Sequence, residues 1–257
     1  MRKQVWKFLV AASTIGAVAH AGFSVRGEAN ARTRYMELER GQRFPINFSR
    51  SEENRIATDA SAQKKSSPQA ILFFGNSLTA GYGLEPSQAF PALIQQKIDA
   101  LKLPYQTINA GLSGETSAGG LRRIDWLLNR KVDILVLELG ANDGLRGIPL
   151  DDTRKNLQEI IARTKKKYPQ AQIVIAGMMV PPNLGQDYSQ QFRRLFVELA
   201  RENKAALIPF LLDGVGGVPE LNLPDGIHPT AKGHEKVAEN VWRVLQPLLH
   251  KTGAKKT

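Results

Sequence analysis

Residues 132–139 read VDILVLEL and carry the clearest strand pattern in the chain. Four further runs of strand length lie at residues 70–74, 105–110, 171–180 and 205–212. Most of these runs are apolar throughout rather than alternating, which is typical of strands buried on both faces of a parallel sheet. The pattern therefore predicts five strands in one sheet.

Stripes of apolar residues at helical spacing follow these runs and predict amphipathic helices. The stripes are Phe90, Leu93, Ile94, Ile98 and Leu101; Leu121, Ile124, Leu127 and Leu128; Leu157, Ile160 and Ile161; Phe192, Leu195, Phe196 and Leu199; and Val237, Val241, Val244, Leu245 and Leu248. Strands joined through helices need crossover connections, so the sheet is parallel and covered on both faces. The predicted fold over residues 68–257 is an α/β class, three-layer α/β/α sandwich with a five-stranded parallel, flavodoxin-like sheet.

The N-terminus has the order of a targeting segment. Residues 1–7 carry three positive charges, residues 8–19 are apolar or small, and Ala19-His20-Ala21 is a small-x-small site. This order predicts a signal peptide over residues 1–21 and an exported protein, periplasmic or secreted. An apolar run of this length is too short to span a hydrocarbon core of about 30 Å, so we expect no stable membrane span after cleavage.

Two alternatives remain for that segment. One is an uncleaved membrane anchor that continues through Val25, and the other is an organelle transit peptide, because no acidic residue precedes Glu28. Residues 22–67 are rich in Arg, Ser, Glu, Asn and Gln, and show no sustained period of 2 or 3.6. We interpret them as a flexible basic and polar linker.

Charge and composition exclude several classes of function. The net charge is +11, and more than half of the positive excess lies in residues 1–67. Residues 68–257 contain no cluster of Lys and Arg interleaved with aromatic residues, so we expect no nucleic-acid partner. The chain has no cysteine, which excludes disulfides, thiolate metal sites and a cysteine nucleophile.

Four histidines are the candidates for a general base. His20 lies in the predicted signal peptide and His250 in the Lys-rich tail, which leaves His228 and His234. His228 follows Asp225 by three residues, and in a turn this carboxylate can accept a hydrogen bond from Nδ1–H and leave Nε2 free to take a proton. His234 has no such carboxylate before it, and we place it on the helix surface.

Polar residues follow three of the predicted strands, where ligands bind in parallel sheets. Ser77 follows the first strand at the start of a helix, as a nucleophile would. Gly114 lies after the second strand and can offer its N–H, and Asn142 lies after the third and can offer its side-chain amide. With the N–H of Ser77 these donors would form an oxyanion hole.

Each of these features has a simpler interpretation. A serine at a strand end is usually a helix cap, and N-D-G is usually a turn. Asp225, His228 and His234 could in principle bind a metal, but no other His or Cys lies near them, so we predict neither a metal nor a cofactor. The order of the segments along the chain, with complementary roles at one sheet edge, favours a catalytic site.

The polar segments together resemble the four sequence blocks of the SGNH (GDSL-type) hydrolase family. Ser77 matches the nucleophile block, Gly114 the glycine block, Asn142 the asparagine block, and Asp225 with His228 the last block. The resemblance implies a serine hydrolase that forms an acyl-serine intermediate, with Ser77, His228 and Asp225 as its triad.

The likeness covers about residues 69–250. GANDGLRG (140–147) and DGIHPTAKGH (225–234) look especially like the exported bacterial branch, whose members act as acyl-CoA thioesterases, arylesterases and lysophospholipases. The family usually has Asp before the nucleophile, where this chain has Asn76. That carboxylate is not a triad member, so we expect activity with a difference in helix-cap geometry or pH dependence.

The expected substrate is therefore a small acyl ester or thioester, handled by a monomer. A carbohydrate O-acetylesterase would use the same triad and stays open. A non-catalytic, flavodoxin-like phosphate-binding module is a more distant alternative, because the chain has neither GxxxxGK[ST] nor GxGxxG.

Overall fold

The computed structural model describes residues 34–37, 43–46, 67–180 and 184–249. The chain divides into two compact units, Met1–Ser66 and Ser67–Thr257. In the first unit, β1 (Arg34–Glu37) pairs antiparallel with β2 (Arg43–Ile46).

This hairpin differs from the sequence expectation of no regular element there, because strands of four residues are too short for a period of 2 to stand out. The flexibility of residues 22–67 stays a prediction. The signal peptide predicted over residues 1–21 lies outside the described residues.

The second unit contains a five-stranded parallel sheet, as the sequence predicts. Its strands are β3 (Gln69–Gly75), β4 (Tyr105–Gly111), β5 (Ile134–Glu138), β6 (Gln172–Ala176) and β7 (Ala206–Ile208). Their order is β4-β3-β5-β6-β7, with every neighbouring pair parallel. The order reverses direction at β3, so the edge of the sheet beyond β3 and β5 is the expected place for a ligand.

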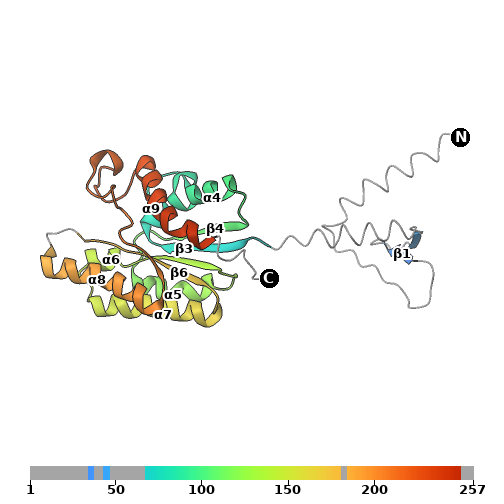
Figure 1. The fold of residues 1–257 in the computed structure, drawn as a ribbon, viewed down its shortest axis with the longest axis horizontal. Helices are drawn as coiled ribbons and strands as arrows, with labels where there is room; N and C mark the ends of the chain where they lie inside the picture. Colours follow the sequence, from blue (N-terminus) through green and yellow to red (C-terminus); the bar gives the residue numbers. More distant parts are fainter. Residues whose placement is uncertain (1–33, 38–42, 47–66, 181–183, 250–257) are drawn as a thin grey trace. The chain divides into compact units, whose positions relative to one another are not determined.

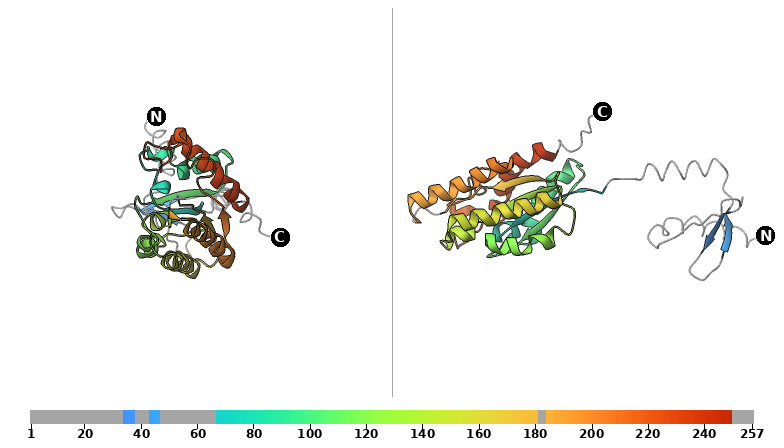
Figure 2. Two further views of the ribbon diagram at one scale, coloured as in Figure 1. Left: turned by 90° about the vertical axis from the view of Figure 1, so that its left-hand side faces the viewer. Right: turned by 90° about the horizontal axis from the view of Figure 1, so that it is seen from below.

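Helices cover both faces of this sheet and complete the three layers (Figures 1 and 2). On one face α4 (Phe90–Ala100) packs against α9 (Ala231–Leu249). On the other face α7 (Leu150–Lys167) lies between α5 (Ser117–Leu127) and α8 (Gln186–Asn203). The predicted three-layer α/β/α architecture is confirmed.

The short helix α3 (Ser77–Ala80) begins at Ser77, where the sequence predicts the start of a helix. Three further short elements were not predicted: α6 (Ala141–Leu145) and the 3₁₀ turns η1 (Pro86–Gln88) and η3 (Pro219–Leu221). Each has five residues or fewer, so a helical period cannot show in the sequence.

Strand β3 connects the two halves of the core, because alternate residues of a strand point to opposite faces. The ring of Phe73 packs edge-on against Phe90 of α4, with centroids 5.5 Å apart. The ring of Phe74 lies under the guanidinium of Arg123 of α5, at 4.6 Å. Both faces of β3 are thereby held, which fixes the position of its carboxyl end.

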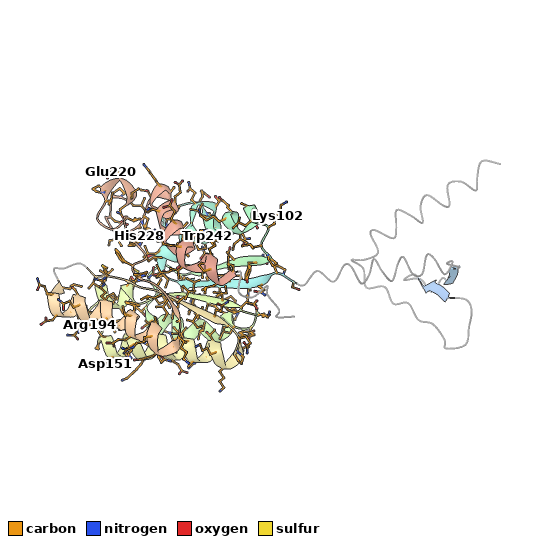
Figure 3. The ribbon with its side chains drawn as sticks, viewed as in Figure 1. Lys102, Asp151, Arg194, Glu220, His228 and Trp242 are labelled. Atoms are coloured by element: carbon orange, nitrogen blue, oxygen red, sulfur yellow. The ribbon has the colours of Figure 1, made fainter. Side chains whose placement is uncertain are left out.

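That carboxyl end carries the polar segments. Figure 3 shows His228 between the two helical layers, at the end of the sheet away from where the chain enters β3. No helix within residues 67–180 and 184–249 is long and apolar enough to cross a membrane.

Candidate active site

Ser77 lies where β3 turns into α3. Asn76 is the N-cap of this helix, and its Oδ1 accepts a hydrogen bond from the Leu78 N–H at 2.9 Å. Gly81 ends the helix in the left-handed conformation at φ 78°. Capping at both ends holds a helix of four residues that could not persist alone.

His228 and Asp225 come from the loop before α9 and meet this serine. His228 Nε2 lies 2.9 Å from Ser77 Oγ, and His228 Nδ1 lies 2.7 Å from Asp225 Oδ2. The three side chains thus form one continuous chain of hydrogen bonds. The structure brings together the three residues for which the sequence predicts a triad.

The loop that presents His228 is held by its own backbone. The Leu223 N–H donates to the His228 carbonyl at 2.7 Å, and the Gly226 N–H donates to the Leu223 carbonyl at 2.8 Å. Asn222 and Pro229 close the loop as an antiparallel bridge. The imidazole is therefore presented from a closed turn.

Asp225 is held in its ionised form. The pKa of its carboxyl is lowered to about 2, first by the hydrogen bond from the His228 N–H, then by the His228 ring and the Ile227 N–H. The backbone donors reach Oδ1 at 3.0 and 2.9 Å. An ionised carboxylate accepts from Nδ1–H, which leaves Nε2 as the acceptor for the Ser77 hydroxyl.

Gly114 lies in the loop between β4 and α5, and Asn142 lies in the short helix α6 after β5. Gly114 has φ 78°, which a residue with a side chain rarely adopts. Asn142 Nδ2 donates one N–H to the Glu115 carbonyl at 2.9 Å, beside Gly114. The Asn142 amide is thereby fixed against the glycine loop, and its second N–H has no hydrogen-bond partner among the residues that the structure describes.

Two buried carboxylates that the sequence did not predict as site residues support these segments. Glu115 forms an ion pair with Arg123, whose Nη2 also donates to the Ala110 carbonyl at 2.7 Å. Asp143 accepts from the Ser117 N–H at 2.8 Å and from its hydroxyl. Each carboxylate directly follows a predicted site residue in the sequence, and this position could have indicated that it lies near the site.

A third missed residue is Glu138, at the end of β5. Its side chain is 1% exposed and contacts the turn that carries Ser77. Burial raises the pKa of Glu138 to about 7, against the opposing effect of hydrogen bonds from Thr79 and Asn76. Its position as a carboxylate at the end of an otherwise apolar strand could have identified Glu138 from the sequence.

The interpretation of His234 as a surface residue is wrong. Its side chain is buried on α9, and its Nδ1 accepts a hydrogen bond from the Phe90 N–H at 3.1 Å. Burial, and then the charge of His228, lower the pKa of His234 to about 4. Its spacing on α9 places it on the face that packs against α4.

No group of three or more His, Asp or Glu side chains within the described ranges is placed to hold a metal ion. The alternative of a metal bound by Asp225, His228 and His234 therefore has no support from the geometry, since His234 is turned into the core.

Comparisons with known proteins agree on one family. Residues 73–236 match the model of the GDSL-like Lipase/Acylhydrolase family. The chain is 39% identical over 187 residues to Esterase TesA of Pseudomonas aeruginosa strain PAO1, covering 72% of this chain and 92% of that protein. It is 35% identical over 181 residues to Thioesterase 1/protease 1/lysophospholipase L1 of Escherichia coli K12, covering 70% and 85%.

Solved structures give the same answer. A crystal structure of TesA has a TM-score of 0.67 at 40% identity, covering 70% of this chain and 99% of that chain. The psychrotrophic esterase EstA from Pseudoalteromonas sp., inhibited by monoethylphosphonate, has a TM-score of 0.67 at 33% identity, covering 71% and 99%. With its five-stranded sheet and its family match, the chain belongs to the GDSL-like lipase/acylhydrolase (SGNH) family and is a serine ester hydrolase.

Proposed function

We propose that Ser77 is the nucleophile of this hydrolase, with His228 as its general base and Asp225 as the group that orients the base. The observation that carries the proposal is the continuous hydrogen-bonded path from Ser77 Oγ through the imidazole to Asp225 Oδ2. A serine hydroxyl is a weak nucleophile until an adjacent base accepts its proton.

In the acylation step, His228 Nε2 takes the proton as Ser77 Oγ bonds to the acyl carbon. The resulting imidazolium is stabilised by the Asp225 carboxylate and gives its proton to the departing alcohol or thiol. A water molecule, deprotonated by His228, then attacks the acyl-serine and releases the acid. His228 gives the proton taken from the water to Ser77 Oγ as the acyl bond breaks, so the serine hydroxyl and the neutral imidazole are both restored.

The oxyanion would be held by the N–H groups of Ser77 and Gly114 and by the Asn142 amide. The first N–H groups of a helix lack intrahelical partners, so the N–H of Ser77 at the start of α3 is free of such a bond. The contact of Asn142 with the Glu115 carbonyl fixes the amide before substrate binds, and preorganised donors stabilise a transition state most effectively.

Apolar side chains on the surrounding loops suggest the substrate class. Six of the nine large apolar side chains exposed in the described residues lie on loops or in the short helix α6 beyond the carboxyl ends of the strands: Tyr82, Leu112, Leu145, Met179, Leu184 and Ile227. The ring of Tyr82 also packs on His228, with centroids 4.5 Å apart. A rim of this kind fits an acyl chain or an aryl group better than a sugar hydroxyl.

Three of those side chains, Tyr82, Leu145 and Leu184, lie in the segments that follow β3, β5 and β6. From their place in the sequence we expect residues 80–86, 144–150 and 181–188 to form the walls of the pocket, of which residues 181–183 lie outside the described ranges. The names of the relatives add esters, thioesters and lysophospholipids as candidate substrates. We therefore propose hydrolysis of lipophilic acyl esters and thioesters by a monomeric enzyme.

A substrate panel tests this proposal. We expect kcat/KM to rise with acyl length across p-nitrophenyl esters, acyl-CoA thioesters to be hydrolysed, and O-acetylated sugars to be poor substrates. Ser77→Ala should abolish turnover of every substrate, whereas Ser87→Ala, an exposed serine ten residues away, should not. A preference for acetylated sugars over aryl esters would favour the O-acetylesterase alternative instead.

A further inference from the structure

The turn that carries Ser77 is attached to Glu138 of the neighbouring strand by three hydrogen bonds. Asn76 Nδ2 donates to Glu138 Oε1 at 2.8 Å. The Asn76 N–H and the Thr79 hydroxyl donate to Glu138 Oε2 at 3.0 and 2.7 Å. Asn76 and Thr79 flank the nucleophile, so Glu138 fixes the turn on both sides of Ser77.

The close approach depends on Gly75. A Cβ at this position would lie 2.1 Å from Thr79 Oγ1 and 2.4 Å from Glu138 Oε2. Glycine therefore leaves room for the carboxylate directly over the last residue of β3. Gly75, Thr79 and Glu138 are therefore closely packed at this edge of the sheet.

The orientation of the Asn76 amide is fixed by its second contact. Its Oδ1 accepts from the Leu78 N–H at 2.9 Å and caps α3, so Nδ2 must face Glu138. Every group that contacts the Glu138 carboxylate within the described residues is a donor. This pattern suits a carboxylate, and only the Thr79 hydroxyl could accept a proton from the acid form, whereas Asn76 offers donors alone.

We propose that Glu138 and Asn76 act as a pair of positioning residues for the nucleophile. The Asn76 amide donates a hydrogen bond to the ionised Glu138 carboxylate, whereas an aspartate at position 76 could form that hydrogen bond only if one of the two carboxyl groups were protonated. The proposal rests on the assignment of Ser77 as nucleophile.

The reason lies in the family's G-D-S-L pattern, where this chain has Asn76. An aspartate would place an oxygen where Nδ2 now lies, 2.8 Å from Glu138 Oε1. Two carboxyl groups at that distance cannot both ionise, so they share a proton, and the second pKa of the pair is strongly raised. The asparagine avoids that shared proton.

Other charged groups around Glu138 are already engaged. From α5, Arg123 Nη2 reaches the Gly75 carbonyl at 3.4 Å but is paired with Glu115. From the loop before α9, His228 contacts Ser77 and is paired with Asp225. Neither is a cause of the raised pKa of Glu138, which burial raises against the lowering effect of the hydrogen bonds from Thr79 and Asn76.

An exchange of the two side chains gives a matched set of variants. In Glu138→Gln alone, an N–H₂ group must face either Asn76 Nδ2 or the Asn76 N–H, so two donors oppose each other in both orientations. In Asn76→Asp alone, the hydrogen bond needs the shared proton. In the double variant, the introduced glutamine can donate to the introduced aspartate, so donor and acceptor are exchanged and the pairing is restored.

The experiment measures kcat for a soluble aryl ester from pH 7.5 to 9.5, above the pKa of about 7 of Glu138. We expect Glu138→Gln to lose about tenfold to a hundredfold in kcat throughout, because small displacements of a nucleophile carry large costs. Asn76→Asp should lose kcat progressively as pH rises. The double variant should return to within about threefold of wild type, with a flat profile.

Asp133→Asn is the matched control, since it removes a carboxylate next to the other end of β5 and should leave the profile unchanged. Wild-type kcat in Glu138→Gln, or a double variant no better than Glu138→Gln, would overturn the proposal.

Thermal unfolding over the same pH range gives a readout independent of catalysis. The melting temperature of Asn76→Asp should fall with rising pH relative to wild type, and that of the double variant should not. If Ser77→Ala were active, the proposed function would fail, yet these melting curves would still decide the pairing. If Glu138→Gln does not fold, the comparison of Asn76→Asp with the double variant still tests the pairing, because only the first should lose kcat and melting temperature as pH rises.

Discussion

At the residue scale, Ser77 depends on groups that hold it as much as on the base that deprotonates it. Its Oγ lies 2.9 Å from His228 Nε2, while its neighbours Asn76 and Thr79 are held by Glu138. A nucleophile fixed on one side by a base and on the other by a buried carboxylate has little freedom to leave the attack geometry.

The triad residues are expected to act as a unit, so their losses should not add. Ser77→Ala and His228→Ala should each remove most of kcat, and combining them should cost little more than either alone. Asp225→Ala should cost less, because Asp225 orients the imidazole without transferring the proton. Steady-state kinetics on an aryl ester measures this; full additivity of the two losses in the double variant would show that the residues act independently.

Asn142→Ala is expected to lower kcat by about 10²–10³ with a smaller effect on KM, because the amide would act mainly in the transition state. The same variant loses the contact with the Glu115 carbonyl, so Asn142→Asp is the companion. It keeps the size of the side chain and removes the donor, and should be equally impaired. An unchanged kcat in both would remove Asn142 from the oxyanion hole.

Single residues were predictable from the sequence where a short motif carried them. Asp225 and His228 are three positions apart, so one turn brings them together, and Ser77 follows a clear strand. Glu138 was not predicted, because its partners lie 59 and 62 residues away and only the pairing of β3 with β5 joins them. His234 was misplaced because its partner, the Phe90 N–H, lies 144 residues away.

At the element scale, α9 begins three residues after His228, where the loop that bears this histidine ends, and it packs against α4 through His234. The His234 ring stacks on Phe90, with centroids 6.1 Å apart, and accepts the N–H at the start of α4. The long elements were predictable because they are long enough to show a period, whereas α3 and α6 arise from caps and strand ends.

The packing of α9 on α4 is expected to weaken in acid. The pKa of His234 is about 4 in the folded protein and lies near 6.5 in an unfolded chain. The unfolded chain therefore binds more protons, and the stability that neutral His234 contributes is complete above about pH 6.5 and is lost as pH falls towards 4. The shift corresponds to a loss on the order of 3 kcal/mol.

His234→Asn tests this expectation, because Asn places an acceptor at about the position of Nδ1 and does not titrate. Relative to this variant, wild type should lose stability in chemical unfolding as pH falls from 6.5 to 4. Taking the difference removes the opposite contribution of Glu138, whose raised pKa favours the folded state at low pH. A difference in stability that does not change with pH would contradict the account.

At the scale of the whole molecule, the residues proposed for catalysis all lie in the unit Ser67–Thr257. Removal of the residues up to about Ser66 is therefore expected to leave kcat/KM nearly unchanged on a soluble ester. A folded but inactive truncation would show that residues before Ser67 contribute to the site.

Export is the second expectation at this scale. The order of charged, apolar and small residues in 1–21 predicts cleavage after Ala21, so N-terminal sequencing of protein from the periplasm or medium should begin near Gly22. Intact Met1 on protein in the cytoplasm would contradict the prediction, and intact Met1 on membrane-bound protein would favour the uncleaved anchor.

The most direct test of the central claim is to map the site of covalent labelling by an organophosphonate. The reagent transfers its phosphonyl group to an activated serine, and peptide mass spectrometry locates the adduct. We predict one adduct per chain, on Ser77, formed much more slowly in His228→Ala and as fast as in wild type in Ser87→Ala. An adduct on another residue, or equal labelling of Ser77→Ala, would contradict the assignment of Ser77 as the nucleophile.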